Sequence, residues 1–312
     1  MIISASRRTD IPAFYSEWFL KRLAAGFVLV PNPFFPQQIR RVELSPAAVD
    51  CLVFWTKNPA PLLPKLERLA DYTYYFHFTL NPYDRTIETG LPEQSERIAT
   101  FRALAERIGK ERVVWRYDPI LFSAAHSLKY HLEQFASLAE RLGPYTERCM
   151  VSFLDFYQKT VRNMAAIAPY DPGDAQLTEL AAGLAAIARS HGLTLETCCE
   201  RLDLERLGIR RGRCIDDRLI ARLSPRPVRF RKASGQREYC GCVAGVDIGV
   251  YNTCRHDCLY CYANTSRKSV ARATAAYHPD APLLCGSLDQ TADIPGQPSS
   301  PAAEQPQLEL FE

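Results

Sequence analysis

The chain has 312 residues, 47% of them hydrophobic, and a formal net charge of +3 at pH 7. This length and apolar content can bury a large core, and the charge is too small to indicate nucleic-acid binding by itself. No window reaches the roughly 18 uninterrupted apolar residues of a membrane span, and MIISASRRTD is not a signal segment. We therefore expect a cytoplasmic protein with no membrane partner, in which eleven cysteines favour metal ligation over disulfides.

Short apolar runs alternate with amphipathic segments along the chain, as in repeated β-α units that build a parallel sheet. Six such units predict an α/β fold, a TIM-like parallel β/α barrel or a large part of one. The predicted strands are 2–6, 51–56, 73–80, 112–117, 149–156 and 193–198, and the predicted helices include 17–26, 96–109, 132–143 and 177–192.

Polar residues recur just after these strands. In a parallel barrel such positions form the mouth at the carboxyl ends of the strands, where active sites lie. Each residue alone is as readily a helix cap or part of a solvated loop, but the set favours a functional mouth. Its members are Arg7, Arg8, Thr9, Asp10, Lys57, Asn58, Asn81, Asp84, Arg116, Asp118, Asp155, Tyr157, Lys159, Glu196 and Glu200.

The most informative segment is CRHDCLYCYAN, in which Cys254, Cys258 and Cys261 have C-x3-C-x2-C spacing and Tyr260 precedes the last cysteine. Three thiolates so close in sequence can converge on one soft metal centre and leave a cluster iron open to another ligand. The alternative is a zinc knuckle, which needs a fourth ligand such as His256 or a distant cysteine.

This motif resembles the cluster-binding signature of radical S-adenosylmethionine (SAM) enzymes, and CLYCYAN looks most like spore photoproduct lyase and its relatives. The resemblance implies a 4Fe-4S cluster, SAM chelated to its fourth iron, an electron donor, and a 5'-deoxyadenosyl radical that abstracts hydrogen. It also implies that Tyr260 lies beside the SAM adenine. Asp10, Lys57, Arg116 and Asp118 are candidates for SAM or substrate contacts at the mouth.

The motif lies near the end of this chain, whereas radical SAM enzymes usually carry it after their first barrel strand. We interpret this as a circular permutation, in which AGVDIGV is the equivalent of that first strand and IISAS is the next one. SRRTDIPAFYSEW and WRYDPIL resemble later segments of the lyase-like enzymes in the same order. The interpretation fails if residues 246–250 lie outside the sheet.

End to end, the chain resembles the domain-of-unknown-function family 1848. The shared segments are SRRTDIPAFYSEW, VFWTKNP, WRYDPI, ETC, CIDD, CGC, DIG-Y-TC and PLLCG, between about residues 2 and 286. This resemblance implies no substrate.

Four further cysteines, Cys198, Cys214, Cys240 and Cys242, fall between the last predicted barrel strand and the motif. They could hold an auxiliary Fe-S cluster or a structural zinc, or they could be small buried hydrophobes. Cys199 would point away from Cys198 in an extended segment and is the weaker ligand candidate.

We expect β/α units over 1–200, a cysteine-containing insertion over 201–242, and a cluster strand, loop and helix over 243–285. Residues 286–312 read as a flexible tail. Its end, QLELF, is similar to the peptide by which bacterial polymerases and repair proteins bind the replication sliding clamp. Its contact residues would be Gln307, Leu308, Leu310 and Phe311.

The leading hypothesis is a radical SAM enzyme that acts on DNA in the manner of a repair lyase and is recruited by the clamp. A second hypothesis keeps the radical chemistry but replaces DNA by RNA, a peptide or a small molecule. A third is a zinc-stabilised binding module without catalysis.

Overall fold

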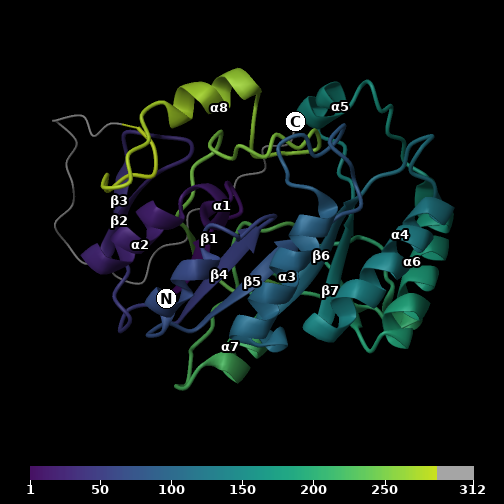
Figure 1. Cartoon of the computed structure of the whole chain (residues 1–312), viewed down its shortest axis with the longest axis horizontal. Helices are drawn as coiled ribbons and strands as arrows, with labels where there is room; N and C mark the ends of the chain where they lie inside the picture. The colour runs from purple at the N-terminus through teal and green to yellow at the C-terminus, as the bar shows by residue number, and fades with distance from the viewer. Residues whose placement is uncertain (287–312) are drawn as a thin grey trace.

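The computed structural model describes residues 1–286 and is built around one eight-stranded parallel sheet (Figure 1). The strand order is β10-β1-β4-β5-β6-β7-β8-β9. The strands are β1 Ile2–Ala5, β4 Cys51–Thr56, β5 Tyr74–Thr79, β6 Val113–Ile120, β7 Arg148–Phe153, β8 Thr194–Thr197, β9 Arg210–Arg211 and β10 Val246–Asp247. The helices are α1 Ile11–Phe14, α2 Ser16–Ala25, α3 Gln94–Ile108, α4 Leu128–Leu142, α5 Gln158–Asn163, α6 Gly173–Ser190, α7 Asp217–Leu223 and α8 Arg267–Thr274.

Strand β10 lies beside β1 although almost the whole chain separates them. The two pair in parallel, with Ile3 opposite Val246 and Ser4 opposite Asp247. The carboxylate of Asp247 accepts hydrogen bonds from Ser4 Oγ at 2.6 Å and from the Arg7 amide at 2.9 Å. The prediction that the segment before the cysteine motif adjoins the N-terminal strand is confirmed.

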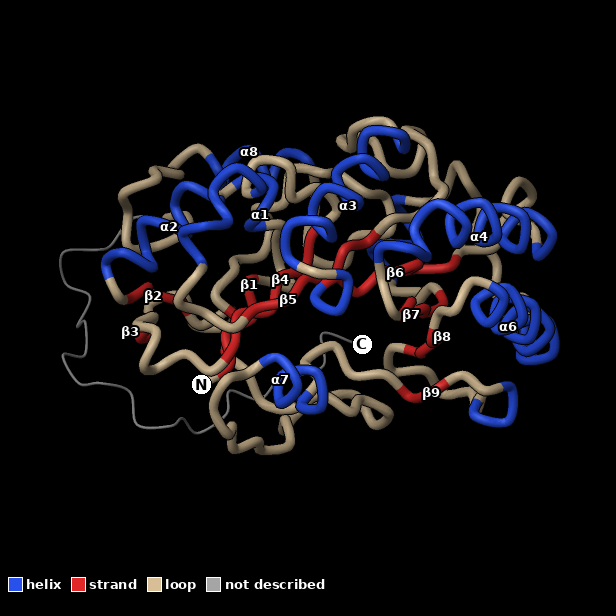
Figure 2. The backbone as a smooth tube through the Cα atoms, turned by 60° about the horizontal axis from the view of Figure 1, so that its bottom comes forward, coloured by secondary structure: helices blue, strands red, loops and turns tan. Residues whose placement is uncertain are grey.

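The sheet buries both faces, so alternate residues of each strand contribute to different apolar clusters. Leu52 and Phe54 of β4 pack with the helices, while Cys51 and Val53 face the opposite side. Figure 2 shows α2, α3, α4 and α6 along one face and α7 along the other. Because α7 and its flanking loops cover the second face, the strands read as nearly continuous apolar runs.

The predicted α/β class and parallel strands are confirmed, but closure of a barrel is not seen in residues 1–286. Strands β9 and β10 end the order, and each pairs with a single neighbour in this part of the chain. The antiparallel hairpin of β2 Phe27–Pro31 and β3 Ile39–Glu43 was not predicted. No helix in this part of the chain is both long and apolar enough to cross a membrane. The predicted clamp peptide lies outside the described residues.

His131 on α4 is a fully buried imidazole that the fold holds neutral. Its Nε2 lies 2.8 Å from the Leu121 carbonyl and its Nδ1 lies 2.9 Å from the Tyr117 hydroxyl. Burial lowers the pKa of His131 to about 4. Between pH 6.5 and 4 the unfolded chain therefore binds a proton at this residue that the folded chain does not, and stability falls as the pH falls.

We expect His131→Gln to flatten this dependence by roughly 3 kcal/mol across that range. The measurement is the free energy of unfolding in urea at pH 7 and near pH 4, with the exposed His191→Gln as control. Equal slopes for His131→Gln and the wild type would show that His131 does not contribute.

Candidate functional site

A cavity of about 870 Å³ opens at the carboxyl ends of the sheet strands. Residues that follow β1, β4, β7, β8 and β10 line it together with the last residues of β6, as the polar residues near the strand ends predicted. Asp10, Lys57, Arg116 and Asp118 all belong to its wall. Three motif cysteines and five others also line it: Cys254, Cys258, Cys261, Cys198, Cys199, Cys214, Cys240 and Cys242.

The cysteine loop is fixed by backbone contacts to residues 87–90. Cys258 forms an isolated antiparallel bridge with Glu88, and the Leu259 amide donates to the Ile87 carbonyl at 3.0 Å. The Gly90 amide donates to the His256 carbonyl at 2.8 Å. A Cβ at Gly90 would lie 2.7 Å from that oxygen, so this contact requires glycine.

Tyr260 ends in a buried polar network below the loop. Its hydroxyl donates to Glu88, and it accepts from Lys57 Nζ at 2.7 Å. Glu88 also pairs with Lys57 Nζ at 2.8 Å and with Arg97 Nη1 at 3.0 Å. Although burial opposes ionisation, the two cations lower the pKa of Glu88. Tyr260 lines the cavity, and its hydroxyl is committed to positioning the loop.

Asp10 connects three segments around the same loop. Its Oδ2 accepts from the Lys57 amide at 2.7 Å and lies 2.7 Å from His256 Nε2, while Oδ1 caps α1 through the Ala13 amide. Asp10 and Lys57 were predicted as cofactor or substrate contacts. The structure gives both of them partners that hold the cysteine loop in place.

The motif thiols share one buried environment. Burial raises the pKa of Cys254, and the nearby Cys261 and Cys258 thiols raise it further. Among residues 1–286, no three Cys, His, Asp or Glu side chains are placed as ligands around a single ion. A 4Fe-4S cluster needs thiols around a shared space, because each thiolate binds a different iron. Three cysteines that line one cavity have the donor chemistry for such a group.

Three buried polar atoms at the cavity have no hydrogen-bond partner in the described residues. They are Arg7 Nε, Thr9 Oγ1 and His256 Nδ1. Buried polar groups in proteins are nearly always satisfied, so each calls for a partner from outside the fold. The cavity volume lies within the range of small-molecule sites.

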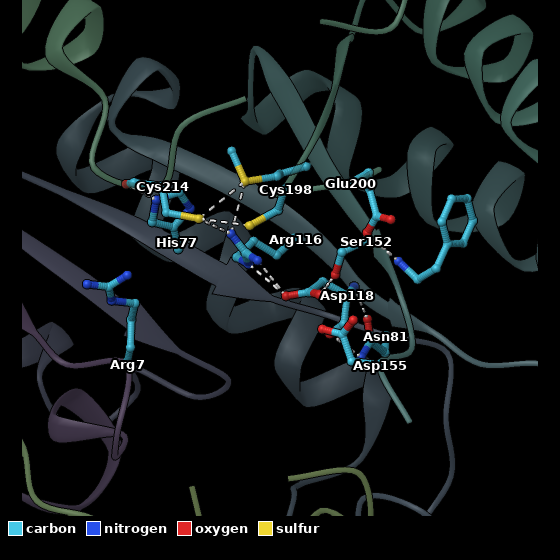
Figure 3. Close-up of polar contacts among 12 residues, drawn as sticks. Arg7, His77, Asn81, Arg116, Asp118, Ser152, Asp155, Cys198, Glu200 and Cys214 are labelled. Carbon is cyan, nitrogen blue, oxygen red and sulfur yellow. Dashed lines mark hydrogen bonds and ion pairs between the residues drawn. The ribbon is translucent and has the colours of Figure 1, made fainter. Parts of the chain in front are cut away.

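Arg116 and Asp118 form an ion pair near Cys198 and Cys214 (Figure 3). Arg116 Nη2 lies 2.6 Å from Asp118 Oδ2, and Nη1 lies 3.1 Å from Cys214 Sγ. Asp118 also accepts from Ser152. This pair therefore connects β6 with Cys214, in the loop between β9 and α7.

The structure brings the predicted second-site cysteines together. Cys198 Sγ lies 3.1 Å from Cys214 Sγ. The thiols of Cys214 and Cys240 both influence the pKa of Cys242, and the Ile215 amide donates to Cys242 Sγ at 3.5 Å. The alternation expected for Cys199 in an extended segment does not apply, because φ is +58° at this residue, and its thiol interacts with that of Cys240.

Five other residues of the predicted mouth fall into two sets. Asp155, Tyr157 and Lys159 line the cavity. Asn81 is buried beneath it with Tyr260, and Glu196 pairs with Arg148. Sequence reasoning missed the Glu88–Arg97 pair. A detectable signal existed, since Arg97 precedes Phe101 and Leu104 by four and seven residues and thus lies on the apolar face of α3.

Fold and site define an α/β protein with a parallel sheet and a cysteine-lined cavity at the carboxyl ends of its strands. The family model described as domain of unknown function DUF1848 matches residues 2–263. The chain belongs to this family.

No curated protein matches the sequence. Among solved structures, a putative alpha-L-fucosidase from Bacteroides thetaiotaomicron VPI-5482 matches at 12% identity over 52% of this chain and 68% of that chain. The TM-score is 0.26, too low to carry an argument about fold or function.

Proposed function

We propose that this protein is a cytoplasmic, circularly permuted radical SAM enzyme with a barrel-like sheet. The observation that carries the proposal is the place of Cys254, Cys258 and Cys261 in one cavity at the carboxyl ends of parallel strands. The parallel pairing of β10 with β1 supports the proposed permutation, in which these two segments are neighbouring strands.

The three motif thiols would hold the cluster, and SAM would occupy the adjoining cavity. A cluster held by these thiols and reduced by an electron donor would supply the one electron that breaks a C–S bond of SAM and gives methionine and a 5'-deoxyadenosyl radical. The chain itself fixes the loop through Asp10 and Glu88 and offers Arg7 Nε, Thr9 Oγ1 and His256 Nδ1 to polar groups of a ligand.

The substrate that we propose is DNA, presented as an unstacked base. Four aromatic side chains at the cavity are exposed by 41–59%, namely Phe34, Phe35, Phe156 and Tyr262. Exposed aromatic rings next to cationic groups provide stacking platforms for nucleobases. The basic side chains Arg8, Lys159 and Arg237 line the same cavity. The clamp peptide at 307–311 would recruit the enzyme to replicated DNA and rests on sequence alone.

The decisive experiment is anaerobic purification and reconstitution, followed by analysis of iron and sulfide. SAM and dithionite are then added, and 5'-deoxyadenosine is measured. Bound Fe-S together with SAM cleavage supports the proposal. A zinc protein that does not cleave SAM would overturn it in favour of the binding module.

We expect Phe34→Ala/Phe35→Ala to weaken binding of single-stranded DNA by about tenfold or more, because each lost stacking contact is worth roughly 1–3 kcal/mol. Fluorescence anisotropy with a labelled oligonucleotide measures the Kd. Tyr170→Ala is the matched control, since Tyr170 is 43% exposed and does not line the cavity. Equal losses in both variants would exclude a specific role for the rim, and tighter binding of RNA would redirect the substrate assignment.

A further inference from the structure

Five cysteines outside the motif line one side of the cavity: Cys198, Cys199, Cys214, Cys240 and Cys242. The sulfurs of Cys198 and Cys214 lie 3.1 Å apart, and the thiols of Cys214, Cys242, Cys240 and Cys199 are near enough in turn for each to shift the pKa of the next. The residues come from three segments, namely the end of β8, the loop before α7, and residues 240–242. We name them the second thiol group.

Packing as small apolar residues does not account for this arrangement. Apolar packing requires neither sulfur against sulfur at 3.1 Å nor a guanidinium nitrogen 3.1 Å from Cys214 Sγ. The pair Arg116–Asp118 holds that guanidinium in place (Figure 3). Cys199 adopts a left-handed backbone conformation that non-glycine residues rarely adopt, and such positions cluster at functional sites.

The donor set suits a soft metal. Four thiolates are the ligands of structural zinc and of iron-sulfur clusters, and a nearby guanidinium offsets part of their negative charge. Around zinc, with Zn–S near 2.3 Å, tetrahedral sulfurs lie about 3.8 Å apart. The Cys198–Cys214 separation of 3.1 Å would open by about 0.7 Å, within reach of the single side-chain torsion of each cysteine.

We propose that Cys198, Cys214, Cys240 and Cys242 bind a second thiolate-ligated metal centre that faces the same cavity as the CxxxCxxC motif. Cys199 is left out of the ligand set, because its thiol lies beside the Arg237 guanidinium, a charged partner, as well as near Cys240 and Cys198. This centre and a centre held by Cys254, Cys258 and Cys261 would line the same cavity. Arg7 is electrostatically coupled to Cys214 and Cys242 and also to Tyr262, the neighbour of Cys261. This inference does not depend on the proposed SAM chemistry.

The test uses the full chain with Cys254, Cys258 and Cys261 all changed to serine, so that any bound metal reports on the second thiol group. The protein is loaded separately with Zn²⁺ and with Fe²⁺ plus sulfide, and metal and sulfide per chain are measured. We expect either one zinc or an iron-sulfur centre to remain, and these two results identify the metal. Adding Cys198→Ser or Cys242→Ser should remove it, whereas Cys199→Ser should not.

A spectroscopic readout covers the case in which those added substitutions prevent folding. Co²⁺ added to the motif-less protein should give thiolate charge-transfer bands and the intense d–d bands of a tetrahedral site. Absence of these bands together with absence of retained zinc or iron would overturn the inference, as would a Cys198–Cys214 disulfide in anaerobically purified protein. Because SAM is not used, failure here leaves the proposed function standing, and failure of SAM cleavage leaves this site standing.

Discussion

Replacing Cys258 by alanine is expected to reduce 5'-deoxyadenosine formation from SAM by more than about 100-fold. Loss of a residue one shell beyond a metal ligand already costs roughly 10–100-fold in affinity or activity, so loss of the ligand itself costs more. Cys258 lines the cavity, and its backbone pairs with that of Glu88, so the loop segment that carries the thiol is fixed in place. The measurement is 5'-deoxyadenosine per chain in a single anaerobic assay, with iron content determined on the same sample.

The matched control is Cys51→Ala. Cys51 is fully buried in β4 and does not line the cavity, so its loss tests general damage to the core. We expect Cys51→Ala to keep its iron and most of its SAM cleavage. If Cys258→Ala and Cys51→Ala cleave SAM equally well, the motif is not the cluster site and the proposed function fails.

Sequence pattern predicted the six long strands of the sheet because their signal is local. In β4, β5 and β6 an apolar run ends at a polar residue, and parallel strands buried on both faces read in this way. A two-residue strand such as β10 has almost no periodic signal of its own. Its position beside β1 was predicted from the order of the cysteine motif and the lyase-like segments along the chain. The polar residues after the strands then placed much of the cavity wall.

The remaining features depend on contacts between distant segments, which no local pattern encodes. The loop of the β2–β3 hairpin places Phe34 and Phe35 at the cavity. Nothing in the local sequence distinguishes these two residues from apolar residues of the core. The thiol of Cys199 turns inward through a positive φ, whereas alternation along an extended strand predicts the opposite direction. Asp10 and Lys57 hold the cysteine loop through His256 and Glu88, and these partners are identified only by the structure.

The network at Glu88 yields the largest expected effect on stability. Glu88 and Arg97 have side chains exposed by only 1% and 2%, and Lys57 is the second cation on the same carboxylate. Glu88→Ala leaves both cations buried without their counter-charge, and breaking a buried pair in this way costs about 3–5 kcal/mol. We expect a loss of that size in the free energy of unfolding, measured by urea denaturation at pH 7.

Two further variants separate the buried charge from general damage. Glu133→Ala removes the partner of Lys129 in an exposed pair on α4 and should change the free energy of unfolding by at most about 0.5 kcal/mol. The double variant Glu88→Ala/Arg97→Met removes one of the two cations left without a counter-charge and should recover part of the lost stability.

Tyr260 donates to Glu88, so Glu88→Ala should also release the cysteine loop and increase the rate at which Cys258 reacts with a thiol reagent. A Glu88→Ala protein with wild-type stability and thiol reactivity would show that the loop is held by its backbone contacts to residues 87–90 and not by this carboxylate.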